Sequence, residues 1–137
     1  MRYITPHILK DLQKKMVFVG GPRQVGKTTL AKAVLSQHYP EGRYFNWDYD
    51  EDRQDILQKK WSDDNRLLVF DELHKYPRWK TWIKGIYDVS HQTHSFLVTG
   101  SARLDIYRRG GDSLMGRYHY WRLHPFTLDE TPTGISS

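Results

Sequence analysis

The feature that most constrains the fold is a glycine-rich segment that stands between an apolar run and a helical pattern. Residues 16–19 (MVFV) are continuously apolar, which is typical of a strand buried on both faces of a parallel sheet. Residues 20–29 read GGPRQVGKTT, and the apolar residues Leu30 and Val34 that follow have helical spacing. The pattern therefore predicts a strand, a tight loop and a helix over 27–38.

The glycine-rich loop matches the pattern G-x-x-x-x-G-K-[ST], with Gly21, Gly26, Lys27 and Thr28 at its fixed positions. Glycines let backbone N–H groups point into such a loop, and the positive end of the next helix completes an anion cradle. We expect Lys27 to reach the β- and γ-phosphates of a nucleotide and the Thr28 hydroxyl to hold Mg²⁺. An ordinary turn with an incidental lysine is the alternative. The residues expected to bind the nucleotide are Gly21, Pro22, Arg23, Gln24, Val25, Gly26, Lys27, Thr28 and Thr29.

Two carboxylates end a second apolar run. Residues 66–72 read RLLVFDE, which places Asp71 and Glu72 at the end of a predicted strand. Strand carboxyl ends meet at the edge of a parallel sheet where ligands bind. Asp71 is expected to support Mg²⁺, directly or through water, and Glu72 to polarise a water for attack on the γ-phosphate. An exposed pair at a strand end is the alternative. The nearby His74 has no second histidine at ligand spacing, so we expect a positioning or packing role for it.

Strands and helices alternate along the rest of the chain. A lead-in over 1–15 has the apolar residues Ile8, Leu9 and Leu12 on one helical face. The alternation predicts a three-layer α/β domain with a parallel sheet, occupying residues 16–137. Strands are predicted at 16–19, 44–48, 66–72, 95–100 and 117–123, and helices at 27–38, 50–60 and 78–90.

Composition excludes several classes of function. The chain has no cysteine, so disulfides and thiolate metal sites are excluded, and this fits the cytoplasm. No apolar run approaches the ~20 residues of a membrane span. The net charge of +5 allows contact with nucleic acid, but no helix-turn-helix or base-stacking platform stands out.

The chain resembles the prokaryotic AAA+-type P-loop ATPases whose phosphate loop reads GPRQVGKTT and which usually carry a C-terminal nuclease-like domain. The matching segments are 21–30, 45–48, 69–80 and 99–130. The resemblance implies a five-stranded, mainly parallel sheet in the order 5-1-4-3-2, with the strand of Asp71 not directly beside the strand of the phosphate loop. It also implies ATP rather than GTP as the nucleotide.

The resemblance also bears on other residues and on the rest of the protein. Thr99 and Ser101 end the fourth predicted strand and share one face; either is a candidate to contact the γ-phosphate or the attacking water, although simple strand termination is the alternative. Arg117 is a candidate to stabilise nucleotide charge, with Arg103 a weaker one and a surface ion pair the alternative. Relatives continue into a helical lid and a second domain, so only the ATPase core is expected here.

Three functions are compatible with these motifs. The first is a Mg²⁺-dependent ATPase core. The second is a nucleotide-gated interaction or DNA-associated module with little or no turnover, which binds a protein partner or a second copy through the surface that a lid would cover. The third is a small-molecule kinase, although such an enzyme needs no glutamate beside Asp71 and no acceptor pocket is evident.

Overall fold

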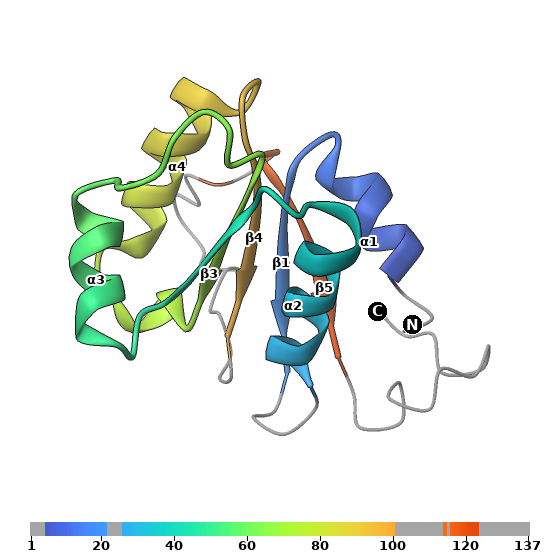
Figure 1. The fold of residues 1–137 in the computed structure, drawn as a ribbon, viewed down its shortest axis with the longest axis horizontal. Coiled ribbons are helices and arrows are strands. Elements are labelled where there is room, and N and C mark those ends of the chain that lie inside the picture. The colour runs from blue at the N-terminus through green and yellow to red at the C-terminus, as the bar shows by residue number, and fades with distance from the viewer. Residues whose placement is uncertain (1–4, 22–25, 101–113, 115, 124–137) are drawn as a thin grey trace.

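The computed structural model describes residues 5–21, 26–100, 114 and 116–123. Within these ranges the strands form one sheet in the order β2-β3-β4-β1-β5, and every neighbouring pair is parallel (Figure 1). This is the expected order 5-1-4-3-2 read from the other edge. The elements are α1 (Thr5–Leu12), β1 (Met16–Gly20), α2 (Lys27–His38), β2 (Arg43–Asn46), α3 (Asp50–Leu57), β3 (Leu67–Asp71), the 3-10 helix η1 (Leu73–Lys75), α4 (Trp79–Ser90), β4 (Ser95–Thr99) and β5 (Tyr118–Arg122).

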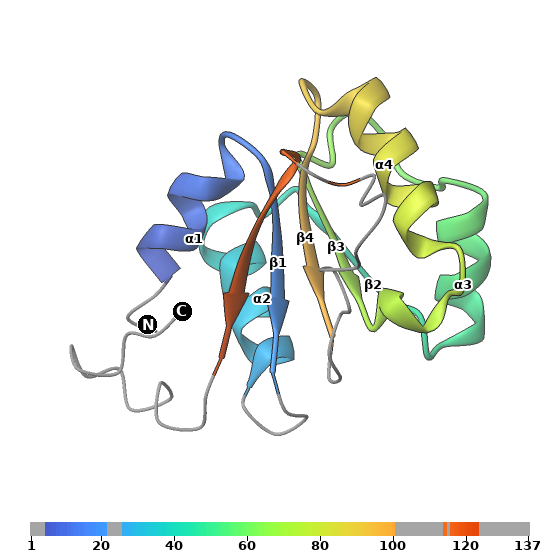
Figure 2. The same ribbon diagram turned by 180° about the vertical axis from the view of Figure 1, so that it is seen from behind.

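Helices cover both faces of the sheet, so the domain has three layers. Helices α1 and α2 pack on one face, and α3 and α4 pack on the other (Figures 1 and 2). Strands β1 and β3 are buried along their whole length, because the sheet has no solvent-facing side at its centre. This double burial explains why their sequences are continuously apolar and do not alternate.

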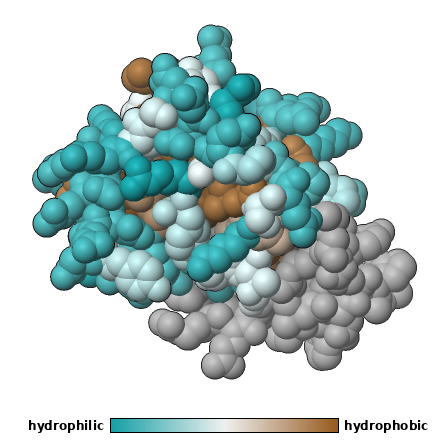
Figure 3. All heavy atoms as spheres, in the orientation of Figure 1, coloured by the Kyte–Doolittle hydropathy of each residue, from teal (hydrophilic) through white to brown (hydrophobic). Residues whose placement is uncertain are grey.

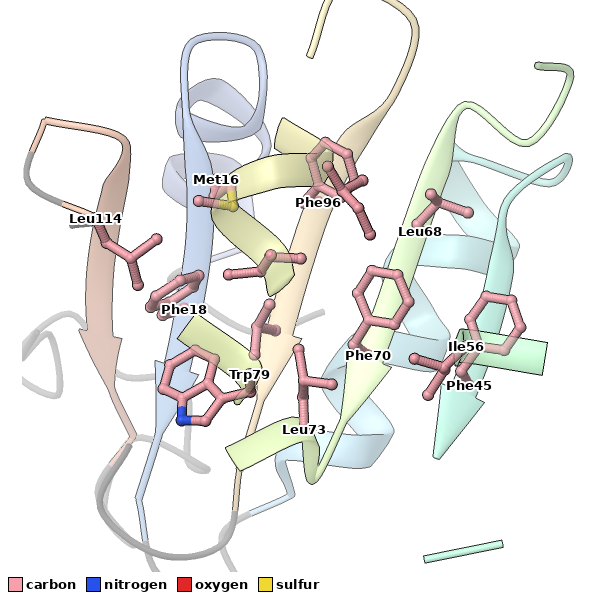
Figure 4. Packing of buried hydrophobic residues seen from close by; sticks show 13 residues of the cluster. Met16, Phe18, Phe45, Ile56, Leu68, Phe70, Leu73, Trp79, Phe96 and Leu114 are labelled. Atoms are coloured by element: carbon pink, nitrogen blue, oxygen red, sulfur yellow. The ribbon is translucent and has the colours of Figure 1, made fainter. Parts of the chain in front are cut away.

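Alternate residues of each central strand point to opposite layers. Phe18 and Phe70 lie in the cluster beneath α3 and α4, where Trp79 also packs (Figure 4). Val17 and Val69 lie in the cluster beneath α1 and α2. The lead-in helix α1 joins this second cluster through its buried apolar side chains, and the indole N–H of Trp121 on β5 donates a 2.9 Å hydrogen bond to Asp11 of α1.

Most predicted elements are confirmed, and the differences at their ends have local causes. Strand β2 stops at Asn46 because its side-chain oxygen accepts a hydrogen bond from the Asp48 N–H (2.8 Å), which starts a turn. Helix α3 ends at Leu57, short of the predicted residue 60. Lys59 there has a left-handed φ of 56°, and the Lys60 N–H donates to the carbonyl of Asp55 (2.9 Å), the hydrogen bond of a helix-ending Schellman motif.

The surface matches the three-layer arrangement. On the face shown in Figure 3, the described side chains are mostly hydrophilic and apolar ones appear only in small areas. Among the described residues, every helix is too short or too polar to cross a bilayer.

The strand order brings three strand ends to one edge of the sheet. Val19 of β1 and Asp71 of β3 are both in register with Thr99 of β4. Strand β4 therefore separates the strand that leads into the glycine loop from the strand that carries Asp71, as the resemblance implies. In Figure 1 this is the lower edge, toward which the strand arrows point.

Candidate nucleotide site

The glycine loop joins the end of β1 to the start of α2 at this edge. Gly21 has φ 143° and Gly26 has φ 85°, conformations that favour glycine because a side chain would be strained there. Lys27 is the first residue of α2 and is only 3% exposed. Its ammonium donates a 3.0 Å hydrogen bond to the carbonyl of Gly21. The lysine side chain therefore folds back over the mouth of the loop. Residues 22–25 (Pro22, Arg23, Gln24 and Val25) lie outside the described residues.

The carboxylate of Asp71 is the hub of the site. Its Oδ2 accepts a 2.8 Å hydrogen bond from the Thr28 hydroxyl of α2, and its Oδ1 accepts a 2.7 Å hydrogen bond from the Thr99 hydroxyl of β4. Asp71 is 2% exposed and Thr99 is fully buried. The structure therefore brings together Thr28, Asp71 and Thr99. Thr29, the next residue of α2, is exposed, and no contact with Asp71 is seen for it.

Tyr44 is a third partner of Asp71 that sequence reasoning missed. Its hydroxyl donates a 2.5 Å hydrogen bond to Oδ2 of Asp71. Burial, and then the hydrogen bond to Asp71, raises the pKa of Tyr44 well above its usual value, so the phenol keeps its proton and remains a donor. Asn46 and Asp71 are in register on neighbouring strands, so Tyr44, two residues before Asn46, is on the same face as Asp71. Once β2 is placed beside β3, this alternation is the signal that could have found it.

Glu72 follows Asp71 but leaves the strand. It has a left-handed φ of 62°, and its N–H donates a 2.8 Å hydrogen bond to the Thr99 carbonyl. Its carboxylate is 3.5 Å from the Lys75 ammonium and 3.7 Å from Nε2 of His74. Lys75 also forms a 2.8 Å ion pair with Asp48. The predicted base is therefore at the site edge, where it is held by neighbouring side chains.

His74 stands beside this carboxylate in a partly buried position. Burial lowers the pKa of His74, against the opposing effect of the Glu72 charge. Its Nδ1 is buried and has no hydrogen-bond partner among the described residues. The neutral imidazole is thus the form that the surroundings favour, which agrees with a packing or positioning role more than with a charged one.

Arg117 is not brought to this site. Its guanidinium donates to both carboxylate oxygens of Asp88 at 2.8 and 3.3 Å. Its carbonyl accepts a hydrogen bond from the N–H of Met16 (3.0 Å), at the start of β1. Because β5 runs parallel to β1, a residue that precedes β5 lies at the edge opposite the glycine loop. Within one chain, Arg117 therefore forms the surface ion pair that was the alternative. Ser101 and Arg103 lie outside the described residues.

A hollow of about 360 Å³ also lies away from the glycine loop. Lys14, Arg66, His91 and His94 line it together with the acidic residue Glu41. These residues precede β1, β2, β3 and β4 or stand at their starts, so the hollow is at the same edge as Arg117. It is separate from the Asp71 cluster.

The site has the features of a phosphate- and cation-binding centre. Mg²⁺ in proteins commonly takes one or two protein oxygen ligands and completes its shell with phosphate and water oxygens. The Thr28 hydroxyl and the Asp71 carboxylate, which touch each other, are oxygens of that kind. Lys27 places a positive charge at the loop mouth, next to the N-terminus of α2, which itself favours anions. The residues present therefore fit a nucleotide with Mg²⁺.

The fold and this cluster place the protein in the class of α/β domains built like a P-loop NTPase core. A family model of an AAA domain matches residues 13–131, which is most of the chain. The chain belongs to this AAA domain family, and it is a nucleotide-binding module of the ATPase type. No curated protein matches the chain.

Proposed function

We propose that this protein binds ATP with Mg²⁺ and hydrolyses the γ-phosphate bond. The observation that carries the proposal is the 2.8 Å hydrogen bond between the Thr28 hydroxyl and Oδ2 of Asp71. It joins the first turn of the helix after a glycine loop to a carboxylate two strands away. A tight turn with an incidental lysine has no reason to make this connection. The absence of cysteine fits our further proposal that the protein works in the cytoplasm.

Each side chain has a distinct role in this proposal. Lys27 and the loop N–H groups balance the charge of the β- and γ-phosphates. Thr28 and Asp71 would hold Mg²⁺, which would neutralise phosphate charge when bound. Thr99 orients Asp71, and Ser101 remains the other candidate to contact the γ-phosphate. Glu72 would accept a proton from water as the water oxygen bonds to the γ-phosphorus, while the bond from that phosphorus to the β–γ bridging oxygen breaks and ADP leaves.

A specific observation favours a second candidate function. The Glu72 carboxylate lies 3.5 Å from the Lys75 ammonium and 3.7 Å from Nε2 of His74, so these side chains compete with a water molecule for it. A protein that remained in this arrangement would bind ATP with little turnover and would act as a nucleotide-gated interaction module.

Calorimetric titration of ATP with Mg²⁺, on the wild type and on Lys27→Ala, tests binding. We expect the wild type to bind and the variant to lose most of its affinity. The absence of heat for the wild type would contradict the proposal. Equal binding by both proteins would contradict the role assigned to Lys27.

Turnover separates the candidate functions. Phosphate release is measured without any added acceptor, for the wild type and for Glu72→Gln. Loss of turnover with retained binding in the variant supports an ATPase. A wild type that binds ATP without turnover supports the gated module, and turnover that appears only with a small-molecule acceptor supports a kinase.

A further inference from the structure

Tyr44 reaches from the edge strand of the sheet to the centre of the site. It lies on β2, opposite Val69 of β3, and its hydroxyl is 2.5 Å from Oδ2 of Asp71. The same oxygen accepts the 2.8 Å hydrogen bond from Thr28. One carboxylate oxygen is thus shared by a donor from the phosphate-loop helix and a donor from the edge strand.

The direction of each hydrogen bond around Tyr44 is fixed by chemistry. An ionised carboxylate only accepts hydrogen bonds, so the phenol must donate to Asp71. An amide NH₂ only donates, so the Asn46 Nδ2, which is 3.3 Å away, gives its hydrogen bond to the phenol oxygen. The phenol therefore donates to Asp71 and accepts from Asn46.

The ring of Tyr44 also contacts a side chain of α2, the helix that follows the phosphate loop. The Lys32 ammonium lies 4.9 Å from the ring centroid, a distance at which a cation is attracted to an aromatic face. Lys32 is four residues after Thr28 on α2, so both side chains are on the same helix face. The contact therefore links the Tyr44 ring to the helix that carries Thr28.

We propose that Tyr44 is a positioning residue for the divalent-cation site of the proposed ATPase. Its hydroxyl holds Oδ2 of Asp71 in place when the Thr28 hydroxyl is engaged elsewhere, while Thr99 holds Oδ1 at 2.7 Å. Outer-shell partners of metal-binding carboxylates typically contribute 10–100-fold to metal affinity. The inference rests on the proposed function, because it concerns the cation that accompanies ATP.

A purely structural role for Tyr44 is distinguished by a matched control. Tyr44 and Tyr39 are both half-buried beside the cluster under α1 and α2. The Tyr39 hydroxyl has no side-chain hydrogen bond among the described residues, whereas the Tyr44 hydroxyl binds Asp71. Tyr44→Phe and Tyr39→Phe therefore remove the same atom from similar surroundings, and only the first removes a contact with the site.

The experiment compares the ATP dissociation constant with excess Mg²⁺ and with a chelator, for the wild type and both variants. The ratio of the two constants measures how strongly the cation supports nucleotide binding. We expect Tyr44→Phe to reduce this ratio about 10-fold and to leave metal-free binding unchanged. Tyr39→Phe should alter neither quantity.

Each other outcome overturns the proposal. If Tyr44→Phe has the same ratio of dissociation constants as the wild type, the hydroxyl does not act on the cation. Loss of metal-free binding as well shows that the hydroxyl supports the fold. If the wild type binds no nucleotide under either condition, the proposed function itself fails, and that result is recognised before any variant is compared.

Discussion

The hydroxyl of Thr99 donates a 2.7 Å hydrogen bond to Oδ1 of Asp71, across the boundary between β4 and β3. Both residues are at the carboxyl ends of their strands and face the same layer, where α2 covers the sheet. A buried, ionised carboxylate needs such donors because it has left water. The bond therefore serves the stability of the domain and also the orientation of the predicted cation ligand.

Replacement of Thr99 by valine should destabilise the domain. Valine keeps the shape and β-branching of threonine but leaves Oδ1 of Asp71, which is 2% exposed, without its donor. Loss of a partner by a buried charged group costs about 1–3 kcal/mol. Urea unfolding of Thr99→Val measures the change in the free energy of unfolding, with Thr99→Ser as a control that retains the hydroxyl. Equal stability of Thr99→Val and the wild type would show that the bond contributes nothing.

The sequence predicted the parts of this site that depend on local order along the chain. Strand, glycine loop and helix follow one another directly, so the positions of Lys27 and Thr28 at the start of α2 could be inferred from spacing alone. Asp71 ends β3 as expected, because it directly follows the apolar residues of that strand in the sequence.

Contacts that depend on strand register could not be inferred in the same way. The resemblance placed β2 beside β3, but it did not tell which residue of β2 pairs with Asp71, so the approach of Tyr44 was missed. The resemblance made Arg117 a candidate to stabilise nucleotide charge, but within one chain it precedes β5 and lies at the other edge of the parallel sheet, with Asp88. The left-handed conformation of Glu72 could not be predicted from the sequence either, because glutamate rarely adopts a positive φ.

The ion pair of Asp88 should stabilise the folded state at neutral pH and lose this contribution in acid. The hydrogen bond from Arg117, followed by that from Lys84, lowers the pKa of Asp88 to about 2 from its usual 3.8. A carboxyl group whose pKa is lower in the folded state stabilises that state at a pH above the unfolded pKa. This contribution disappears as the pH falls through the folded pKa. The pH window of the loss is therefore between 3.8 and about 2.

In Arg117→Gln the pKa of Asp88 should rise toward 3.8, which carbon-detected NMR titration of the carboxyl can measure. Thermal melting of this variant and the wild type should differ near neutral pH and converge below the window. A pKa that stays near 2 in Arg117→Gln would show that Lys84 suffices.

Replacing each of two glycines by alanine should change the stability of the domain in opposite directions. A Cβ on Gly42 would lie 2.8 Å from the Leu67 carbonyl and 2.3 Å from a Leu35 methyl, so Gly42→Ala should cost about 1–3 kcal/mol. A Cβ on Gly85, inside α4, meets nothing within 4 Å, so Gly85→Ala should stabilise by about 0.5–1 kcal/mol. Chemical denaturation measures both, and a loss of stability in Gly85→Ala would contradict the open surroundings of that residue.

Lys75 should govern how readily Glu72 acts as a base. Its ammonium is 3.5 Å from the Glu72 carboxylate and 2.8 Å from Asp48, so it ties the predicted base to the turn after β2. Lys75→Met keeps the stem of the side chain and removes the charge that lies beside the Glu72 carboxylate. We expect phosphate release to increase, because the ammonium no longer competes with the attacking water for the carboxylate, while ATP affinity stays the same. Lys84→Met, which breaks a surface pair with Asp88 (3.1 Å), is the matched control. Turnover that falls in Lys75→Met would instead mean that the ammonium holds Glu72 in its working position.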